Sequence, residues 1–581
     1  MANGKWLMAL GHSHQRSAIS HDARDSVLRW IVLVAALVVL VASLTFENVW
    51  PTPAVHWRAA LSVELAVCVL GLGIVSRWSR PPSRAAIACL SAIWTLLVVG
   101  HYAEVTAPAL YGRDINLYWD LRFIPDVAAM VTTVAPWWLI VLSVSGAVLT
   151  LVLLYTLLGL AWRCIAASMA DDHQRRALIA LSLAAVAWFI VRPPKPDAPG
   201  EITVHAFASP VVRTYARQVR FVAEAIAGSR ALPDSPPMTS DLSRVQGSDV
   251  YLVFVESYGA VSFDRPALAQ PIAASRARLD AAIRETGRQV VSAFVESPTF
   301  GGSSWLAHIS LLSGIEVRDP ETNAKLMTAQ RDTLAKAFGR RGFRTVGLMP
   351  GLRQSWPEGV FYGFNEIYGA ERLDYQGPEF GWFAIPDQYS LARFDALEAE
   401  RGSAGRRFIF FPTISTHFPF RPTPPYQADW PRLLTRRPYD GPDIVRAYAR
   451  QPDWTDFGPG YVEAMTYDFD VLAGYLKTHA DRDLVMIVLG DHQPPAAVSG
   501  EHAPWDVPVH VIASRAAVLD RLRACGFSPG LTPARHPIGR MHQLLPMLLD
   551  AFGDLAANPL AISSQPSAIS PHSRRAPRAD S

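Results

Sequence analysis

Cysteine is scarce in this sequence, with four residues among 581. Cys68 and Cys89 lie within apolar segments and Cys164 lies just after one, so Cys525 is the only cysteine in the polar remainder of the chain. No disulfide can therefore form within that remainder. A domain there has to be stable through its own hydrophobic core, which a large domain can supply.

A basic tract is also lacking. The formal net charge is only +3, and no run of Lys and Arg has the density that is typical of nucleic-acid binding. We therefore expect no nucleic-acid partner. The basic residues of the first third stand between apolar segments instead, where they carry information about membrane orientation.

Long apolar runs fill the first third of the chain. A transmembrane helix needs about 20 predominantly apolar residues, and five runs approach or exceed this length, so we expect a five-helix transmembrane domain over residues 1–192. A soluble bundle is the alternative, but its helices are seldom so uniformly apolar. A signal peptide is set aside because the first run is too long and four more follow. The runs are 28–46, 59–76, 85–103, 134–160 and 177–192.

Lys and Arg in the short loops predict the orientation of these spans. The loops on one side hold ten basic residues and those on the other side hold three. This asymmetry places the N-terminus in the cytoplasm and, after five spans, everything beyond residue 192 outside, as in a bacterial inner-membrane protein. The ten are Lys5, Arg16, Arg24, Arg29, Arg77, Arg80, Arg84, Arg163, Arg175 and Arg176, and the three are Arg58, Arg113 and Arg122.

Two assignments near the membrane segments stay open. Glu64 lies in the second apolar run and is either a functional residue by its depth or a polar residue near the end of a tilted helix. Residues 203–230 carry Arg213, Arg217 and Arg220 at helical spacing. They predict either an amphipathic helix that lies on the membrane or on the catalytic domain, or a plain connecting helix.

From residue 249 onward, short apolar runs alternate with helical stretches. The runs are β-branched or aromatic and unbroken by polar residues, which is typical of strands buried on both faces of a parallel sheet. We expect a linker over 193–248, a doubly wound α/β domain with a mostly parallel sheet over 249–553, and a disordered tail over 554–581. The runs are 250–255, 290–295, 345–349, 408–412, 484–489 and 507–513.

Ligands of doubly wound folds bind beyond the carboxyl ends of the strands, and several reactive side chains stand there. Glu256 follows the first strand, and Asp491 and His492 follow the strand at 484–489. A carboxylate directly after a buried strand is costly unless it is solvated, paired or bound to metal. Adjacent Asp and His residues offer an oxygen and a nitrogen to one cation. Taken separately, Glu256 and the Asp491-His492 pair are each explained equally well as residues of a solvated loop.

Two further strand ends carry hydroxyl and imidazole groups. After the strand at 290–295, two glycines precede Ser303 and Ser304, and a helix is predicted from Ser304 to its end at Gly314. A hydroxyl at a helix N-terminus is well placed to meet an anion, although an ordinary N-cap is the simpler interpretation. His308 lies one turn along this helix. His417 follows the strand at 408–412 and is either a core or a site residue.

Together these four segments resemble the alkaline phosphatase superfamily, and most of all its sulfatase-like branch of lipoteichoic acid synthases and phosphoglycerol transferases. That branch has five membrane spans before an extracytoplasmic catalytic domain. The resemblance makes Glu256, Asp491 and His492 metal ligands and makes Ser304 both the nucleophile and a ligand. Ser304 is favoured over Ser303 because the nucleophile of related sulfatases precedes a terminal Thr-Gly pair by nine residues, and Ser313-Gly314 takes that place.

The resemblance also implies substrate-binding residues. His417 matches a His that contacts the head group, His308 takes the place of a basic sulfatase residue, and Trp356 lies in a segment like the substrate-binding Trp region. An Arg is expected two residues after that Trp; Glu358 stands there instead, and Arg353 is the candidate replacement. The sulfatase motif that is oxidised to formylglycine is missing, which argues against sulfatase activity.

The activity that this resemblance implies is transfer of a phospholipid head group, most readily phosphoglycerol, to a periplasmic or cell-envelope glycan or to a lipid. The metal would be one divalent ion, Zn²⁺ or Mn²⁺, with Mg²⁺ as an alternative. Three other functions stay open: a phosphodiesterase or phosphatase, a phosphoethanolamine transferase, and a non-catalytic membrane sensor of envelope lipids. Phosphoethanolamine transferases usually carry disulfides in the soluble domain, and this chain can form none there.

Overall fold

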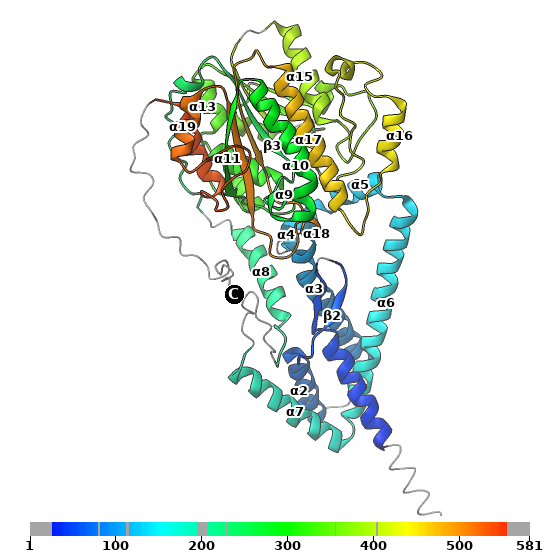
Figure 1. Ribbon diagram of the computed structural model, residues 1–581. Helices are drawn as coiled ribbons and strands as arrows, with labels where there is room; N and C mark the ends of the chain where they lie inside the picture. The colour runs from blue at the N-terminus through cyan, green and yellow to red at the C-terminus, as the bar shows by residue number, and fades with distance from the viewer. Residues whose placement is uncertain are drawn as a thin grey trace, which may run out of the picture.

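The computed structural model describes most of the chain. The described residues are 26–50, 52–78, 82–111, 115–193, 206–227, 231–354, 356–402 and 405–554. The start of the predicted linker and almost all of the predicted disordered tail lie outside these ranges. The described chain has an N-terminal helical region and a C-terminal α/β region, which lie one above the other in Figure 1.

Helices occupy all five of the predicted membrane segments. Three of them are long and apolar enough to cross a membrane: α3 (Arg84–Tyr111), α6 (Trp137–Ser168) and α7 (Asp172–Val191). The described part of the first helix, Ser26–Ala42, is shorter. Helix α2 (Val63–Trp78) has 16 residues and is about 24 Å long at 1.5 Å per residue, which is less than the thickness of the hydrocarbon core. The predicted count of five spans is therefore not confirmed.

Short elements that the sequence did not predict fill the connections between these helices. Strands β1 (Phe46–Asn48) and β2 (Val55–Trp57) form a hairpin between the first helix and α2. Helices α4 (Leu117–Asp120) and α5 (Ile124–Val134) lie between α3 and α6. Glu64 stands in the first turn of α2, where its carboxylate accepts hydrogen bonds from the Ser62 hydroxyl and the Val212 backbone. This arrangement agrees with a polar residue near a helix end.

Helix α8 (Val212–Ala227) packs on the N-terminal helices. The Tyr215 hydroxyl donates to the Leu96 carbonyl, Arg217 pairs with Glu104, and the Gln218 amide donates to the Ile115 carbonyl over 2.9 Å. The structure therefore places this helix against α3 and α4, a position that the sequence did not predict.

The C-terminal region is built on an eight-stranded sheet of order β10-β4-β9-β8-β3-β7-β5-β6. All six predicted apolar runs are strands of this sheet, and the short β6 and β10 were not predicted. The strands are β3 (Asp249–Val255), β4 (Gln289–Glu296), β5 (Arg344–Met349), β6 (Glu366–Gly369), β7 (Arg407–Pro412), β8 (Leu484–Gly490), β9 (Asp506–Ala513) and β10 (Ser528–Pro529).

The direction of the strands decides where the strand ends meet. Strands β8, β3, β7, β5 and β6 are parallel, β9 is antiparallel to β8, and β4 is antiparallel to β9. Because two reversals cancel, β4 runs in the same direction as β3. The carboxyl ends of β3, β4, β7 and β8 therefore lie along one edge of the sheet, as the predicted mostly parallel sheet requires.

Helices cover both faces of the sheet, as expected for a doubly wound fold. One face packs against α10 (Pro266–Glu285), α15 (Asp387–Arg401) and α17 (Gly458–Thr478). The other face packs against α11 (Ser304–Ser313), α13 (Leu334–Arg340), α19 (Ala516–Ala524) and α20 (Leu544–Phe552). These two apolar layers exclude water from the strands and so hold the strand ends in place.

The edge that carries the strand ends faces the N-terminal helices. Helices α9 (Val261–Asp264) and α18 (Ala496–Ser499), which follow β3 and β8, lie at the lower end of the α/β region in Figure 1. Helix α18 also contacts α3. The segments that follow these strands are therefore close to the helices that could enter a membrane.

Candidate metal centre and nucleophile

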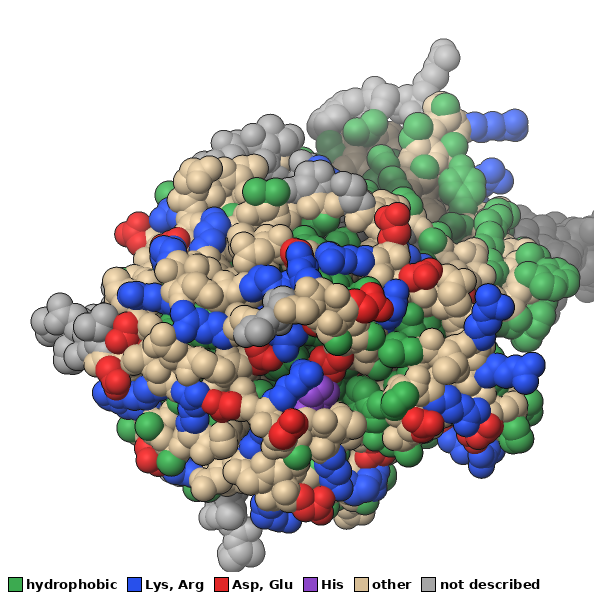
Figure 2. Space-filling view, turned by 90° about the horizontal axis from the view of Figure 1, so that it is seen from above, with side chains coloured by type: hydrophobic (Ala, Val, Ile, Leu, Met, Phe, Trp, Pro, Cys, Tyr) green, Lys and Arg blue, Asp and Glu red, His purple; other side chains and the backbone are tan. Residues whose placement is uncertain are grey.

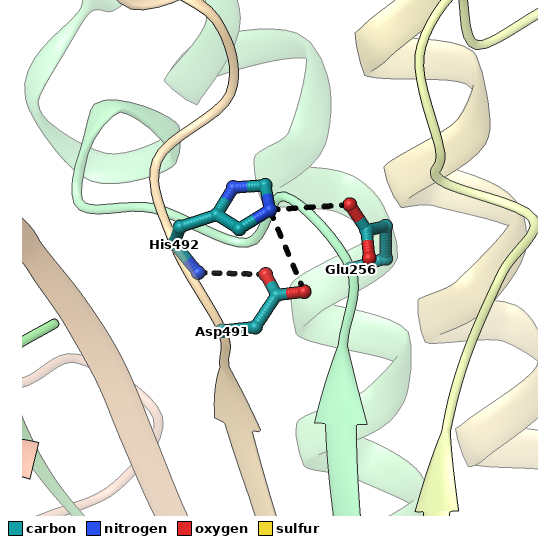
Figure 3. A group of neighbouring side chains, drawn as sticks. All are labelled: Glu256, Asp491 and His492. Carbon is teal, nitrogen blue, oxygen red and sulfur yellow. Dashed lines mark hydrogen bonds and ion pairs between the residues drawn. The ribbon is translucent and has the colours of Figure 1, made fainter. Parts of the chain in front are cut away.

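Three side chains with metal-binding atoms meet at the ends of two neighbouring strands. Glu256 follows β3, and Asp491 and His492 follow β8; the two strands pair in parallel so that Val255 lies opposite Gly490. The potential ligand atoms of these three side chains all lie within 4.8 Å of one another, and all three residues are buried. Figure 3 shows the two carboxylates and the imidazole turned toward one another.

A close approach of backbone at Gly490 produces this convergence. A Cβ atom at this position would lie 1.8 Å from the Tyr258 carbonyl oxygen, so only glycine fits. The neighbouring Ser257 adopts a left-handed backbone conformation with φ of 59°, and its N–H donates to Asp491 Oδ1 over 2.8 Å. The end of β8 is thus fixed against the turn that carries Glu256.

Ser304 is the first residue of α11 and touches this cluster. Its hydroxyl donates to Glu256 Oε2 over 2.7 Å, and its Oγ lies 3.2 Å from His492 Nε2. The preceding turn, Gly301-Gly302-Ser303, has positive φ at all three residues, which two glycines accommodate. Ser303 makes no side-chain cap bond to the helix. The structure therefore brings Ser304, and not Ser303, to the cluster, and α11 ends at Gly314 as predicted.

The donor set fits a divalent cation. Three oxygens, from Glu256, Asp491 and Ser304, and one nitrogen, from His492, converge from two strand ends and one helix. Oxygen and imidazole ligands of this kind suit Zn²⁺, Mn²⁺ and Mg²⁺. Asp491 Oδ2 is buried and has no hydrogen-bond partner among the described residues, although a buried oxygen without a partner is costly. A cation at this place would satisfy it.

The charges in the cluster are strongly coupled. Burial raises the pKa of Asp491 well above its usual range, and the neighbouring Glu256 carboxylate raises it further. Burial alone would raise the pKa of Glu256 as well, but the imidazolium of His492 holds it below its usual range. Burial opposes protonation of His492, yet the two carboxylates raise its pKa to about 9. Two carboxylates held this close together favour a positive charge between them.

His308 lies on α11, one turn after Ser304, between two phenyl rings. Its ring packs against Phe254 at 4.6 Å and Phe410 at 5.4 Å between ring centroids. Burial lowers the pKa of His308 to about 3, and its Nε2 is buried without a hydrogen-bond partner in the described chain. Burial between two phenyl rings disfavours the charged imidazole, and the predicted substrate-binding role of His308 stays a prediction.

His417 lies near the cluster at the end of β7. Its Nδ1 is 2.7 Å from the Phe418 carbonyl oxygen, which favours a proton on Nδ1 and leaves Nε2 as the reactive nitrogen. Its charge helps to lower the pKa of Glu256. Because β7 pairs in parallel with β3, His417 and Glu256 stand at the same edge of the sheet.

Arg353 and Trp356 lie at the same edge of the sheet, after β5. Arg353 donates to the Trp382 carbonyl over 2.8 Å and stacks on the Trp382 ring, while Trp356 packs on Tyr362. In the part of the chain that the structure describes, neither side chain has a hydrogen bond, ion pair or ring contact with the four clustered residues. The predicted substrate-binding role of these two residues stays a prediction.

The residues that hold the cluster in place were not predicted from the sequence. The Thr413 hydroxyl accepts from the Glu256 backbone N–H over 3.2 Å and donates to Asp468 Oδ2 over 3.1 Å. Asp387, at the start of α15, accepts from the backbone N–H groups of Ile414 and Ser415. Both Asp residues are buried. The sequence shows only that Asp387 and Asp468 stand among apolar residues of predicted helices. This does not identify the residues with which they pair.

The comparisons with known proteins give structural neighbours only. No family model matches the chain, and no curated protein matches it. Solved structures that match include lipoteichoic acid synthase LtaP from Listeria monocytogenes, with 14% identity over 57% of this chain and 80% of that chain and a TM-score of 0.35. Another is the Streptococcus pyogenes phosphoglycerol transferase GacH in complex with sn-glycerol-1-phosphate, with 11% identity, 58% and 80% coverage and a TM-score of 0.33.

A third match spans both regions of the chain. It is the integral membrane protein lipooligosaccharide phosphoethanolamine transferase A (EptA) from Neisseria meningitidis, with 13% identity over 84% of this chain and 88% of that chain and a TM-score of 0.41. The chain described above is thus similar to solved enzymes that are named as lipoteichoic acid synthase, phosphoglycerol transferase and phosphoethanolamine transferase.

Proposed function

We propose that this protein is a membrane-anchored, metal-dependent transferase that moves a phospholipid head group, phosphoglycerol first among the candidates, to a glycan or lipid acceptor through a covalent intermediate on Ser304. The observation that carries the proposal is the position of the Ser304 hydroxyl, which lies at the N-terminus of α11 and in hydrogen-bond contact with Glu256 and His492. A hydroxyl in this position can be activated and can meet an anionic phosphate.

The metal would be held by Glu256, Asp491, His492 and Ser304 Oγ. When bound, it would lower the pKa of the serine hydroxyl and balance the charge of the phosphate. The hydrogen bond to Glu256 orients Ser304, and the positive end of the α11 dipole lies beside the incoming phosphate. His308 offers a neutral imidazole nitrogen to a phosphate oxygen. Ser304 is only partly buried, so a substrate can reach its hydroxyl.

The proposed reaction has two transfer steps, in which Ser304 carries the phosphoryl group and His417 carries the proton. In the first, ionised Ser304 Oγ forms a bond to phosphorus, the bond from phosphorus to the diacylglycerol oxygen breaks, and that oxygen takes a proton from His417 Nε2. In the second, an acceptor hydroxyl loses its proton to His417 Nε2 and bonds to phosphorus, and Ser304 Oγ leaves. His417 ends the cycle protonated, as it began.

The membrane region would hold this site beside its donor. We propose an N-terminus in the cytoplasm and a catalytic region in the periplasm or outside the cell, based on the distribution of basic residues. Contact between α18 and α3 supports an active site that is close to the bilayer surface. A donor that is confined to the same surface is present at a high effective concentration, which reduces the entropic cost of the encounter.

The experiment is mass spectrometry of the Ser304 peptide after the full-length protein has been incubated with phosphatidylglycerol or phosphatidylethanolamine vesicles. We expect an adduct of phosphoglycerol mass on wild-type protein, none on Ser304→Ala, and the wild-type adduct on the matched control Ser303→Ala. A phosphoethanolamine adduct would reassign the donor. Lipid hydrolysis that needs no acceptor would make the protein a phosphodiesterase. A Ser304→Ala protein that transfers head groups at the wild-type rate would disprove the proposal.

A further inference from the structure

Two groups of three aromatic rings, joined in the chain at His417 and Phe418, lie beside the candidate site. His417 lies 5.0 Å from Phe383, which contacts Trp382 at 6.3 Å. On the other side, Phe418 follows His417 in the chain and packs on Phe457 at 4.6 Å, and Phe457 contacts Trp454 at 5.9 Å. The members of this aromatic row are Trp382, Phe383, His417, Phe418, Phe457 and Trp454.

These rings are not core residues. Each of the six is partly or fully exposed, and the side chain at the outer end, Trp454, is 38% exposed. By contrast, the aromatic residues on the sheet and on the helices that cover it, such as Phe254 and Tyr475, are fully buried. Phe418 and Phe457 pack on the core with one side and are partly exposed on the other, and apolar surface left exposed in a patch can mark a surface that binds something.

The row connects the site to the end of the region that faces the membrane helices. Its inner member His417 follows β7, which pairs in parallel with β3, so it stands at the same edge of the sheet as Glu256. Its outer member Trp454 belongs to the connection between α16 (Gly441–Ala449) and α17, which lies at the lower end of the α/β region in Figure 1. In the same area α16 exposes Val445 and Tyr448. The opposite end, in Figure 2, carries interspersed acidic and basic side chains instead.

Arginines stand beside the row at both ends. The Arg353 guanidinium stacks on Trp382. Arg421 and Arg450 both pair with Glu463 on α17, and Asp453 and Asp456 flank Trp454 in the sequence. Trp, Tyr and Arg at the boundary between water and apolar surface are typical of a membrane interface, where they meet ester and phosphate groups. A glycan surface would require amide and carboxylate groups directed at sugar hydroxyls beside the rings.

We propose that the aromatic row is the surface on which the acyl-glycerol part of the phospholipid donor slides from the bilayer to Ser304. The inference rests on the proposed function and deepens it, because it assigns a site to the part of the donor that is not transferred. Trp454 and Phe457 would receive the lipid at the membrane, and Phe418 and Phe383 would flank its glycerol beside His417.

The first test compares two donors in the full-length protein reconstituted in nanodiscs. We expect Trp454→Ala to raise the KM for phosphatidylglycerol about tenfold, which corresponds to the loss of one aromatic contact. The turnover of bis(p-nitrophenyl) phosphate, a soluble diester without acyl chains, should not change. Trp454→Phe should keep most of the lipid affinity. An unchanged lipid KM, or a changed KM for the acceptor glycan in place of the donor, overturns the proposal.

The second test does not depend on catalysis. With Trp454 replaced by photoreactive benzoylphenylalanine, illumination in nanodiscs should produce a phospholipid adduct on the peptide that contains position 454. The same replacement at Asp481, an exposed residue in the turn before β8 and so at the opposite end of the sheet, should give none. Absence of lipid at position 454 refutes the row as a lipid surface even if transfer occurs. A lipid adduct in a protein without transfer activity would refute the proposed function and support the row.

Discussion

Replacement of Asp491 by Asn should stabilise the metal-free protein and remove its response to metal. Asp491 Oδ1 accepts from the backbone N–H groups of Ser257 and His492, and the Asn carbonyl oxygen can keep both bonds. Within the described residues, Asp491 Oδ2 is buried without a hydrogen-bond partner, 3.7 Å from His492 Nε2, and the Asn amide would place a donor there, next to Glu256. Relief of one unsatisfied buried oxygen is worth about 2 kcal/mol, or a rise of roughly 4 °C in the unfolding midpoint.

The metal-bound protein should respond in the opposite direction. At a metal concentration 100 times its Kd, wild-type protein gains about 2.7 kcal/mol of stability. Loss of an anionic ligand should weaken metal binding by at least about 100-fold. Under the same conditions, Asp491→Asn then gains only about 0.4 kcal/mol. The two proteins should therefore exchange their order of stability when metal is added.

The assay is thermal unfolding of the full-length protein in detergent, after treatment with a chelator and again with Zn²⁺ or Mn²⁺. The matched control is Asp481→Asn, at an exposed position far from the cluster, and it should follow wild type in both conditions. A metal-free Asp491→Asn protein that melts below wild type and gains as much as wild type from metal would refute the reasoning, because Oδ2 would then be neither strained nor a ligand.

Three further predictions follow from the same geometry. The buried carboxyl of Asp491 has a raised pKa, so Asp491 lowers the stability of the protein above its unfolded-state pKa of about 3.9. The extra stability of metal-free Asp491→Asn over wild type should therefore vanish near about pH 4 and grow toward about pH 7. Thermal unfolding across this pH range measures it. Thr413→Val leaves the Glu256 backbone N–H unpaired and should cost about 2 kcal/mol and weaken metal binding in a titration, whereas Thr413→Ser should do neither. His308→Leu should leave the melting temperature within a few degrees of wild type but lower kcat/KM about 100-fold; unchanged kcat/KM would assign His308 a packing role only.

Strand positions and the start of α11 were predictable from the sequence because both are encoded locally. A buried strand needs a run such as 484–489, and the Gly-Gly-Ser-Ser turn followed by apolar residues at helical spacing defines both ends of α11. The direction of β9 was not predictable, since a strand that is buried on both faces reads the same in either direction.

Contacts between segments that are distant in the sequence were not predictable without a resemblance. Nothing near Thr413 indicates that its hydroxyl joins Glu256 to Asp468, because the two partners lie 157 and 55 residues away. The charge state of His308 depends on Phe254 and Phe410, which belong to different strands. Its neutrality is a property of tertiary packing, and only the position of the residue on α11 could be derived from spacing.

Because β3 pairs with β8, the positions of the clustered residues do not depend on the length of the chain between the two strands. Ser257 and Asp491 are 234 residues apart in sequence, yet their separation in space is set by two adjacent strands. Insertions or deletions between β5 and α17 can therefore reshape the surface around Trp382, Phe418 and Trp454 without moving a single cation ligand. Changes in these loops can therefore alter which molecules the surface contacts, while Glu256, Asp491 and His492 stay together at the ends of β3 and β8.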